Sequence, residues 1–152
     1  MTEMLFYHLK GQILEQVLPA LLQKSLERGW RVVVQASSEE RVDALDAHLW
    51  TWRDDAFLPH GTSRDTEAAE QPIVLTASAD NPNGATVRFL VDGAMIVPDG
   101  AGYERIVLLF DGEDPEAVEM ARVRWSEAKA AGADVTYWRA DERGRWQRQA
   151  GV

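Results

Sequence analysis

Cysteine is absent from the 152 residues, and this absence removes several kinds of chemistry at once. The chain forms no disulfide, holds no metal through a thiolate and uses no thiol as a nucleophile. A chain without cysteine also suits a reducing compartment, so we expect a cytoplasmic protein.

Long apolar runs and a basic charge are also missing. No run approaches the roughly 20 apolar residues that a membrane helix needs, and the start, MTEMLFYHLK, lacks the pattern of a signal peptide. The 16 basic residues are outnumbered by 25 acidic ones, which gives a net charge of −9. Since tight binding to DNA or RNA normally requires a basic surface, we expect no membrane contact and no tight, direct binding to nucleic acid. A direct nucleic-acid binder with a local basic patch remains an alternative.

The sequence motifs of nucleotide-binding proteins and hydrolases are absent too. The segment after the first apolar run, HLKGQILEQ, contains neither a P-loop nor GxGxxG, and the chain has no GxSxG. A zinc site could in principle use His48, His60 and Asp54 or Asp55, but this spacing matches no known metal motif. We therefore expect no cofactor and no metal, although an orphan nucleotide-binding α/β protein or enzyme remains an alternative.

Strand and helix patterns alternate along the first 50 residues. EMLFYHL and WRVVVQA read as buried strands. Between them, leucine and valine side chains recur at helical spacing over residues 14–26, around Pro19, and Gly29 suits the end of that helix. Ser37 and Glu40 have capping-box spacing and predict the start of a second helix, in which Val42, Leu45 and Leu49 form the apolar stripe.

Later segments continue the pattern. PIVLTA, TVRFLVDG, YERIVLLFDG and ADVTYWRA read as strands, residues 115–131 as a helix, 61–72 as a surface loop and DERGRW as a hairpin or a tail. The chain therefore predicts one α/β domain over residues 1–152. We expect a Rossmann-like three-layer domain, with a mostly parallel sheet of five or six strands and helices on both faces.

The helix predicted over residues 115–131 carries two contrasting faces. Small side chains suited to packing on a sheet recur at Ala117, Met120, Ala121, Ala128 and Ala131. The other face presents Arg122, Trp125, Ser126 and Lys129 at i, i+3, i+4 and i+7. An arginine beside a tryptophan is suited to an anionic ligand that carries a ring. Alternatively, Trp125 folds onto a neighbouring loop and the cations pair with nearby acids.

The segment HLWTWRDDAFLPHG, residues 48–61, concentrates aromatic side chains without regular alternation. Trp50 and Phe57 either close the edge of the sheet or form a patch for another protein.

Several stretches together resemble the chi subunit family of bacterial DNA polymerase III. These are FYHL, LEQVLPALLQKSLERGWRVVV, EERVDALDAHLWTWRDDAFLPHG, YERIVLLFDGED, ARVRWSEAKAAGADVTYW and GRW. The resemblance implies a non-catalytic accessory subunit of the replicative holoenzyme. Such a subunit binds the acidic C-terminal tail of single-stranded DNA-binding protein and joins the clamp loader through the psi subunit or an equivalent.

The resemblance also implies roles for individual residues. Arg122 falls on a basic position that holds the tail's carboxylate, and Trp125 on an aromatic position beside the tail's phenylalanine. Ser126 departs from a position that is commonly lysine, and Lys129 or Arg124 would compensate for the lost charge. The psi surface is expected at Trp50, Phe57, Pro59 and His60.

Overall fold

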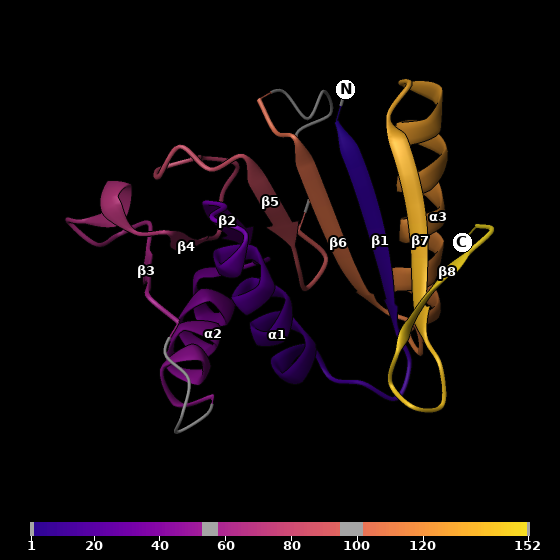
Figure 1. The fold of residues 1–152 in the computed structure, drawn as a ribbon, viewed down its shortest axis with the longest axis horizontal. Coiled ribbons are helices and arrows are strands. Elements are labelled where there is room, and N and C mark those ends of the chain that lie inside the picture. Colours follow the sequence, from indigo (N-terminus) through magenta and orange to yellow (C-terminus); the bar gives the residue numbers. More distant parts are fainter. Residues whose placement is uncertain (1, 53–57, 95–101, 152) are drawn as a thin grey trace.

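One eight-stranded sheet forms the centre of the computed structural model, which describes residues 2–52, 58–94 and 102–151 (Figure 1). The strand order is β3-β4-β2-β5-β6-β1-β7-β8. All neighbouring strands run parallel except β7 and β8, which are antiparallel. The strands are β1 (Glu3–Leu9), β2 (Val32–Gln35), β3 (His60–Thr62), β4 (Ile73–Thr76), β5 (Val87–Leu90), β6 (Arg105–Asp111), β7 (Asp134–Ala140) and β8 (Trp146–Gln149).

The predicted count of five or six strands is therefore wrong, and the two weakest strands account for the difference. β3 is three residues long, too short to show alternation, and falls where residues 61–72 were expected to be a loop. β8 has the sequence WQRQ, an exposed edge strand with little apolar content. Both strands are fixed by pairing with a neighbour, which the local sequence does not encode.

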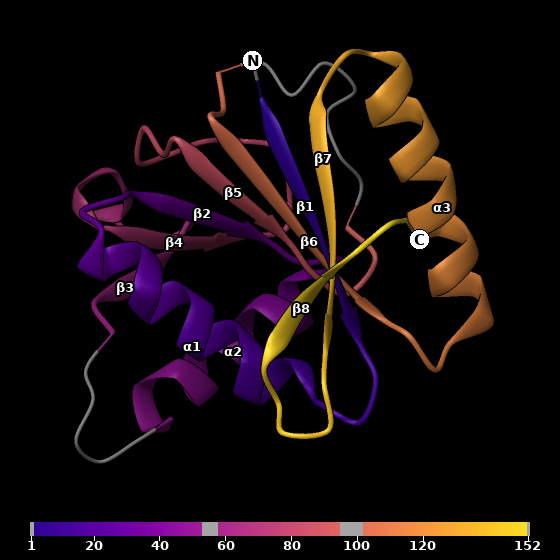
Figure 2. The same ribbon diagram turned by 45° about the vertical axis from the view of Figure 1, so that its right-hand side comes forward.

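Helices cover both faces of the sheet, as predicted, and leave a mostly parallel sheet between them (Figure 2). α1 (Leu14–Glu27) and α2 (Glu39–Thr51) lie on one face, while α3 (Pro115–Ala130) lies on the other. A short 3₁₀ helix, η1 (Ala68–Glu70), precedes β4. Among the described residues, no helix is both long and apolar enough to cross a bilayer.

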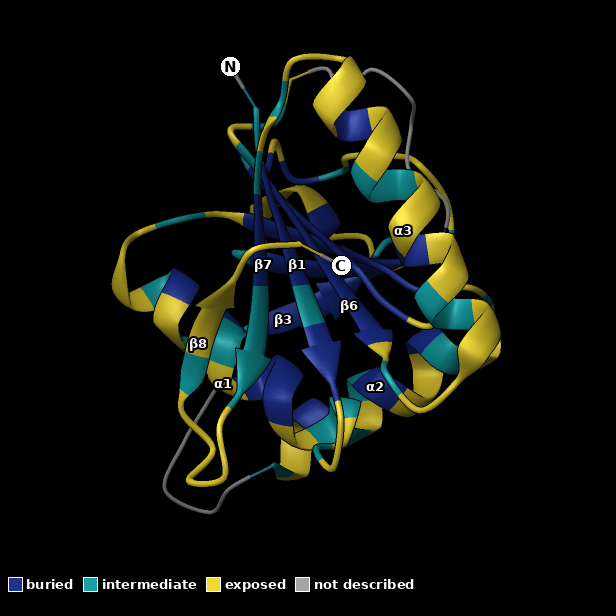
Figure 3. Ribbon diagram, turned by 90° about the vertical axis from the view of Figure 1, so that its right-hand side faces the viewer, coloured by how far each residue is buried: buried dark blue, intermediate teal, exposed yellow. Residues whose placement is uncertain are grey.

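Two apolar clusters hold these layers together. The first joins both N-terminal helices to the sheet through buried side chains that include Leu18, Leu22, Leu45, Val34 and Phe89. The second joins α3 to the opposite face through Phe6, Ile106, Leu108, Ala121 and Ala128. β1 serves both clusters, because alternate side chains of a strand point to opposite faces. Figure 3 shows the resulting contrast between buried strands and the exposed outer side of α3.

Arg88 is the largest fully buried side chain and lies 1% exposed on β5. Its guanidinium donates to the Gln35 side-chain oxygen at 2.6 and 3.1 Å, to the Ser78 and Asp80 carbonyls at 2.7 and 2.8 Å, and to the Tyr103 hydroxyl at 2.9 Å. These five bonds use all the donors of an arginine. Arg88 thus ties the turn after β4 to the sheet and has no donor left for a ligand.

Candidate functional site

α3 is held with its small side chains against the sheet. Asp114 caps the helix by accepting a 3.0 Å hydrogen bond from the Glu116 amide, and Pro115 occupies the first turn. Ala121 and Ala128 are buried as predicted, but Met120 is 48% exposed. Trp125 takes part in the contact with the sheet instead, because its half-buried ring packs against Phe6 of β1.

Trp125 forms the half-buried floor of the predicted binding stripe. Its ring meets Phe6 edge-on at a centroid distance of 5.3 Å and Tyr137 at 6.3 Å. The Lys129 ammonium lies 5.9 Å from the centre of the Trp125 ring. A Cβ built on Gly151 would lie 3.9 Å from this ring, so the C-terminal segment passes beside it. Figure 3 shows that end of the chain near α3.

Arg122 is exposed at the side of this tryptophan and only weakly paired. Its side chain is 59% exposed, and the Glu119 carboxylate is 3.8 Å away. Burial raises the pKa of the Tyr137 hydroxyl, while the guanidinium groups of Arg139 and Arg122 act in the opposite direction. The helix and β7 each contribute a positive charge that acts on that hydroxyl, and we call this region, with Trp125, the cationic corner.

Arg139 is the residue of this corner that the sequence analysis missed. It follows Tyr137 by two positions on β7, so both side chains belong to the same face of the sheet. That spacing was visible in VTYWRA. The sequence does not show that β7 lies next to α3, so it could not place Arg139 beside the stripe on that helix.

A buried histidine connects the corner to the carboxyl ends of the central strands. His8 Nδ1 shares a 2.7 Å hydrogen bond with the Tyr137 hydroxyl, and burial is the main cause of the lowered pKa of His8. Nearby Arg139 and Lys10 lower the pKa further, and Asp111 opposes them. A Cβ at Gly112 would overlap the His8 ring. The stretches FYHL, LFDG and VTYW therefore meet at one place.

The remaining predicted residues of α3 differ in their surroundings. Ser126 is exposed and adds no charge to the stripe. Arg124 is only 18% exposed and its guanidinium lies 2.9 Å from the Glu127 carboxylate. Lys129 is exposed and adjoins Trp125. Of the two cations expected to compensate for Ser126, Lys129 is thus the one that lies along the stripe.

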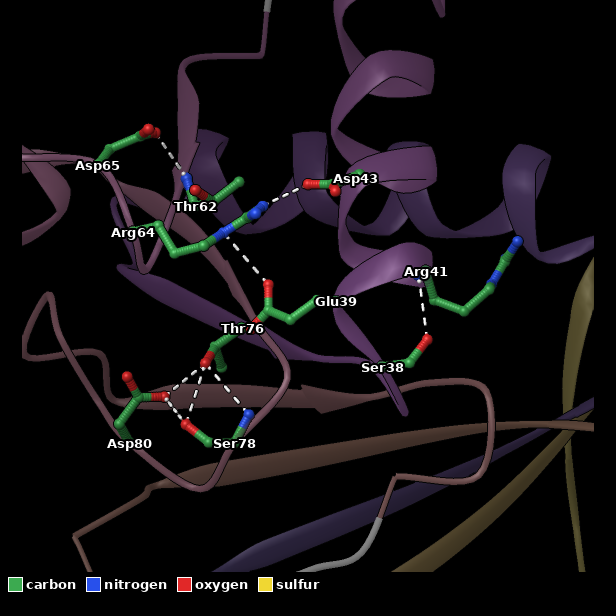
Figure 4. Close-up of polar contacts among 10 residues, drawn as sticks. All are labelled: Ser38, Glu39, Arg41, Asp43, Thr62, Arg64, Asp65, Thr76, Ser78 and Asp80. Atoms are coloured by element: carbon green, nitrogen blue, oxygen red, sulfur yellow. Dashed lines mark hydrogen bonds and ion pairs between the residues drawn. The ribbon is translucent and has the colours of Figure 1, made fainter.

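The three histidines and the clustered hydroxyl groups show no hydrolytic arrangement in the part of the chain that the structure describes. His48 Nε2 contacts the Glu15 carbonyl at 2.5 Å, and His60 contacts the Leu58 carbonyl at 2.6 Å. No group of three potential metal ligands occurs among the described residues. Figure 4 shows a separate cluster after β4, in which the hydroxyls of Thr76 and Ser78 donate to Asp80. This cluster contains no histidine, the usual base for a serine nucleophile.

The predicted partner surface lies at the opposite edge of the sheet. Trp50 is 52% exposed near the end of α2, and its ring lies 4.3 Å from that of His60. His60 is buried beneath it and also contacts Asp46 at 3.0 Å. Trp50, Pro59 and His60 line one side of a cavity of about 450 Å³. Phe57 falls outside the described residues.

Comparison with known proteins points to one family. The family described as DNA polymerase III chi subunit, HolC matches residues 1–136 of this chain. The chain is 28% identical over 91 residues to a probable DNA polymerase III subunit chi of Rickettsia prowazekii (strain Madrid E), which corresponds to 60% of this chain and 55% of that relative. It is 24% identical over 107 residues to DNA polymerase III subunit chi of Pseudomonas aeruginosa, corresponding to 70% and 72% of the two chains.

The chain thus spans little more than half of the Rickettsia relative. The family match nevertheless covers most of the sequence and includes α1, α2 and α3. This protein therefore belongs to the DNA polymerase III chi subunit family.

Proposed function

We propose that this protein is a non-catalytic accessory subunit of the replicative DNA polymerase III holoenzyme. In this role it joins the clamp loader, through psi or an equivalent subunit, to the acidic C-terminal tail of single-stranded DNA-binding protein. Its contact with DNA is then mainly indirect, through the protein that coats the single strand. It works in the cytoplasm, at replication forks on the nucleoid.

The cationic corner on α3 and β7 is the observation that carries this proposal. The charges of Arg122 and Arg139 act on the Tyr137 hydroxyl, and the Tyr137 ring lies 6.3 Å from the half-buried ring of Trp125. A guanidinium group can hold a carboxylate through two charge-assisted hydrogen bonds. An adjacent aromatic ring offers apolar contact to a terminal phenylalanine. The corner therefore supports capture of a peptide that ends in an aromatic residue.

Local charge also supports binding of an acidic tail despite the net charge of −9. Lys129 extends the cationic stripe along α3, and Arg122 is too far from Glu119 for a close hydrogen bond. Hence Arg122 can exchange this loose contact for a ligand carboxylate at small cost.

The exposed indole of Trp50 supports the second half of the proposal. Large aromatic side chains are enriched at the centres of protein interfaces, where they fill pockets on the partner. Trp50 stands beside a hollow and rests on the buried ring of His60. We assign this surface, with Pro59 and His60, to the clamp-loader partner, and the prediction for Phe57 concerns a residue outside the described part of the chain.

Titration of a fluorescent peptide with the sequence of the tail, with and without its last phenylalanine, tests the proposal. A charge-assisted hydrogen bond contributes about 1.5–3 kcal/mol, so Arg122→Ala should raise the Kd about tenfold to a hundredfold. Arg139→Ala should act in the same direction. Removing the phenylalanine should weaken binding to the unmodified protein.

Arg64→Ala is the matched control, because it removes the same charge near β3, at the far edge of the sheet. Its guanidinium is 50% exposed and pairs with Glu39 and Asp43 (Figure 4). Equal affinities for Arg122→Ala and the unmodified protein would refute the assignment of the carboxylate site.

A further inference from the structure

A second cavity lies on the face of the sheet opposite to α3. It has a volume of about 240 Å³ and is floored by apolar side chains of β1, β5 and β6. The C-terminal half of α1 forms one wall, and Trp138 and Trp146 of the β7–β8 hairpin form the other. Figure 1 shows α1 and the hairpin on the two sides of this region.

Aromatic rings make up much of the cavity wall. Tyr7 packs edge-on against Trp146 at a centroid distance of 4.8 Å and lies parallel to Trp138 at 6.3 Å. Trp30 lines the cavity beside them. A space of this size bordered by rings fits one further aromatic ring, since rings pack favourably edge-to-face or offset.

Three cations stand at the same cavity, although the protein as a whole is acidic. These are Lys24, Arg28 and Arg105. Arg105 is paired with Glu3 at 3.1 Å. Within the described parts of the chain, neither Lys24 nor Arg28 has a carboxylate oxygen within the 4.0 Å of an ion pair. Arg28 and Arg105 also lie over the Trp30 ring, at 5.0 and 4.5 Å from its centre. The α1 side of the cavity therefore carries positive charge that no ion pair with a described residue offsets at Lys24 or Arg28.

The polar side chains that line the cavity are mainly donors. No Asp, Glu, Asn or Gln side chain is in the lining. A nucleobase that entered would bury amino or ring N–H groups without a carboxylate or amide oxygen to accept from them, which is unfavourable. A carboxylate brings only acceptors, which match lysine and arginine.

We propose that this cavity binds an aromatic carboxylate, with the ring inside and the carboxylate on Lys24 and Arg28. The ligand is either a free small molecule or the last residue of a peptide, since both present the same chemistry. The site is independent of the proposed tail site, because it uses the other face of the sheet and shares none of its residues.

The indole N–H signals of Trp30 and Trp146 in ¹⁵N-labelled full-length protein report on this cavity directly. We expect N-acetylphenylalanine to shift both signals, and the corresponding amide, which lacks the charge, to bind about tenfold more weakly. Lys24→Gln and Arg28→Gln should each weaken binding by about the same factor. Both side chains are exposed, so the spectra of these variants should keep the dispersion of a folded protein.

Arg122→Gln is the control for the other face and should leave these two indole shifts and their affinity unchanged. That result separates the cavity from the tail site, whichever way the peptide titration on α3 turns out. An acidic peptide ending in phenylalanine distinguishes the sources. Tighter binding than N-acetylphenylalanine identifies a peptide end, and weaker binding a free molecule.

Two results would overturn the proposal. One is equal affinity for the carboxylate and its amide, because the cations would then contribute nothing. The other is a shift of the same indoles by adenosine monophosphate with none by N-acetylphenylalanine, which would make the cavity a nucleotide site.

Discussion

His48 occupies the place of a hydrogen bond that the backbone of α1 lacks. Pro19 has no N–H, so the Glu15 carbonyl four residues earlier receives no helical bond. The His48 ring nitrogen approaches that carbonyl at 2.5 Å from α2. His48, which the sequence raised as a possible zinc ligand, therefore supplies a hydrogen-bond partner to the carbonyl that Pro19 leaves without one. This contact helps α1 to continue through Pro19.

At the carboxyl ends of β1 and β6, Gly112 is required by the ring that lies over it. Gly112→Ala should destabilise the fold by about 1–3 kcal/mol, because the new Cβ would overlap the His8 imidazole. The free energy of unfolding in urea measures this. In the background of His8→Ala, the same glycine substitution should cost much less, since the overlap is gone.

Gly151→Ala serves as the control, because its Cβ would make only an ordinary contact with Trp125. Equal costs of Gly112→Ala with and without the His8 ring would show that the glycine serves another purpose.

His8 should also make stability depend on pH. Its pKa in the folded protein lies below the ordinary value of 6.5, chiefly because of burial. The unfolded chain therefore binds the proton more readily, and the contribution of His8 to stability is present above pH 6.5 and is lost as the pH falls. His8→Gln should reduce the loss of unfolding free energy between about pH 7.5 and 5.5. An unchanged pH profile in this variant would contradict this role.

Among the secondary-structure elements, α2 shows how a one-residue error arises from local sequence. Two serines precede this helix, and Glu40 pointed to Ser37 as the cap. In the structure the cap is Ser38, whose hydroxyl accepts from the Arg41 amide at 3.2 Å (Figure 4). Either serine can cap a helix. The backbone enters the helix at Ser38, which has the extended conformation of an N-cap residue, and this selects Ser38.

Ser38→Ala should therefore lower the free energy of unfolding by about 1 kcal/mol. Ser37→Ala is the matched control and should change it by less than half as much. Thermal or urea unfolding of the two variants distinguishes them, and the reverse order would restore Ser37 as the cap.

The limits of prediction are clearest where an element depends on its neighbours. Apolar runs were sufficient to find β1, β2 and β6, because both faces of these strands are covered. β3 and β8 form by pairing with a neighbouring strand, and Arg139 belongs to the proposed tail site only because β7 lies beside α3. Met120 was predicted to pack against the sheet, and this prediction is wrong because the side chain is 48% exposed. Helical spacing alone did not show which of the neighbouring side chains would face the sheet.

For the whole molecule, the separation of the two proposed partner surfaces leads to a further prediction. The cationic corner lies on α3 and β7, and Trp50 lies near β3 at the far end of the sheet. Trp50→Ala should abolish or strongly weaken binding of the clamp-loader partner and leave the tail-peptide affinity within about twofold. Arg122→Ala should show the converse pattern.

Both partners should therefore bind together, with little effect on each other's affinity. Calorimetry of the peptide against the preformed complex tests this, since any coupling must appear equally in both affinities. A large loss of peptide affinity in the complex would mean that the two surfaces overlap or compete. Met120→Ala, another exposed apolar side chain, is the control for non-specific effects of removing apolar surface.

The position of β1 in the sheet has a consequence for how the chain is made. It lies between β6, which begins at Arg105, and β7, which begins at Asp134. A ribosome delivers the chain from its N-terminus, so β1 waits unpaired until the residues of β6 and β7, about a hundred positions later, have been translated. Its apolar sequence is therefore open to chaperones during this interval, and the centre of the sheet closes only when β6 and β7 have emerged.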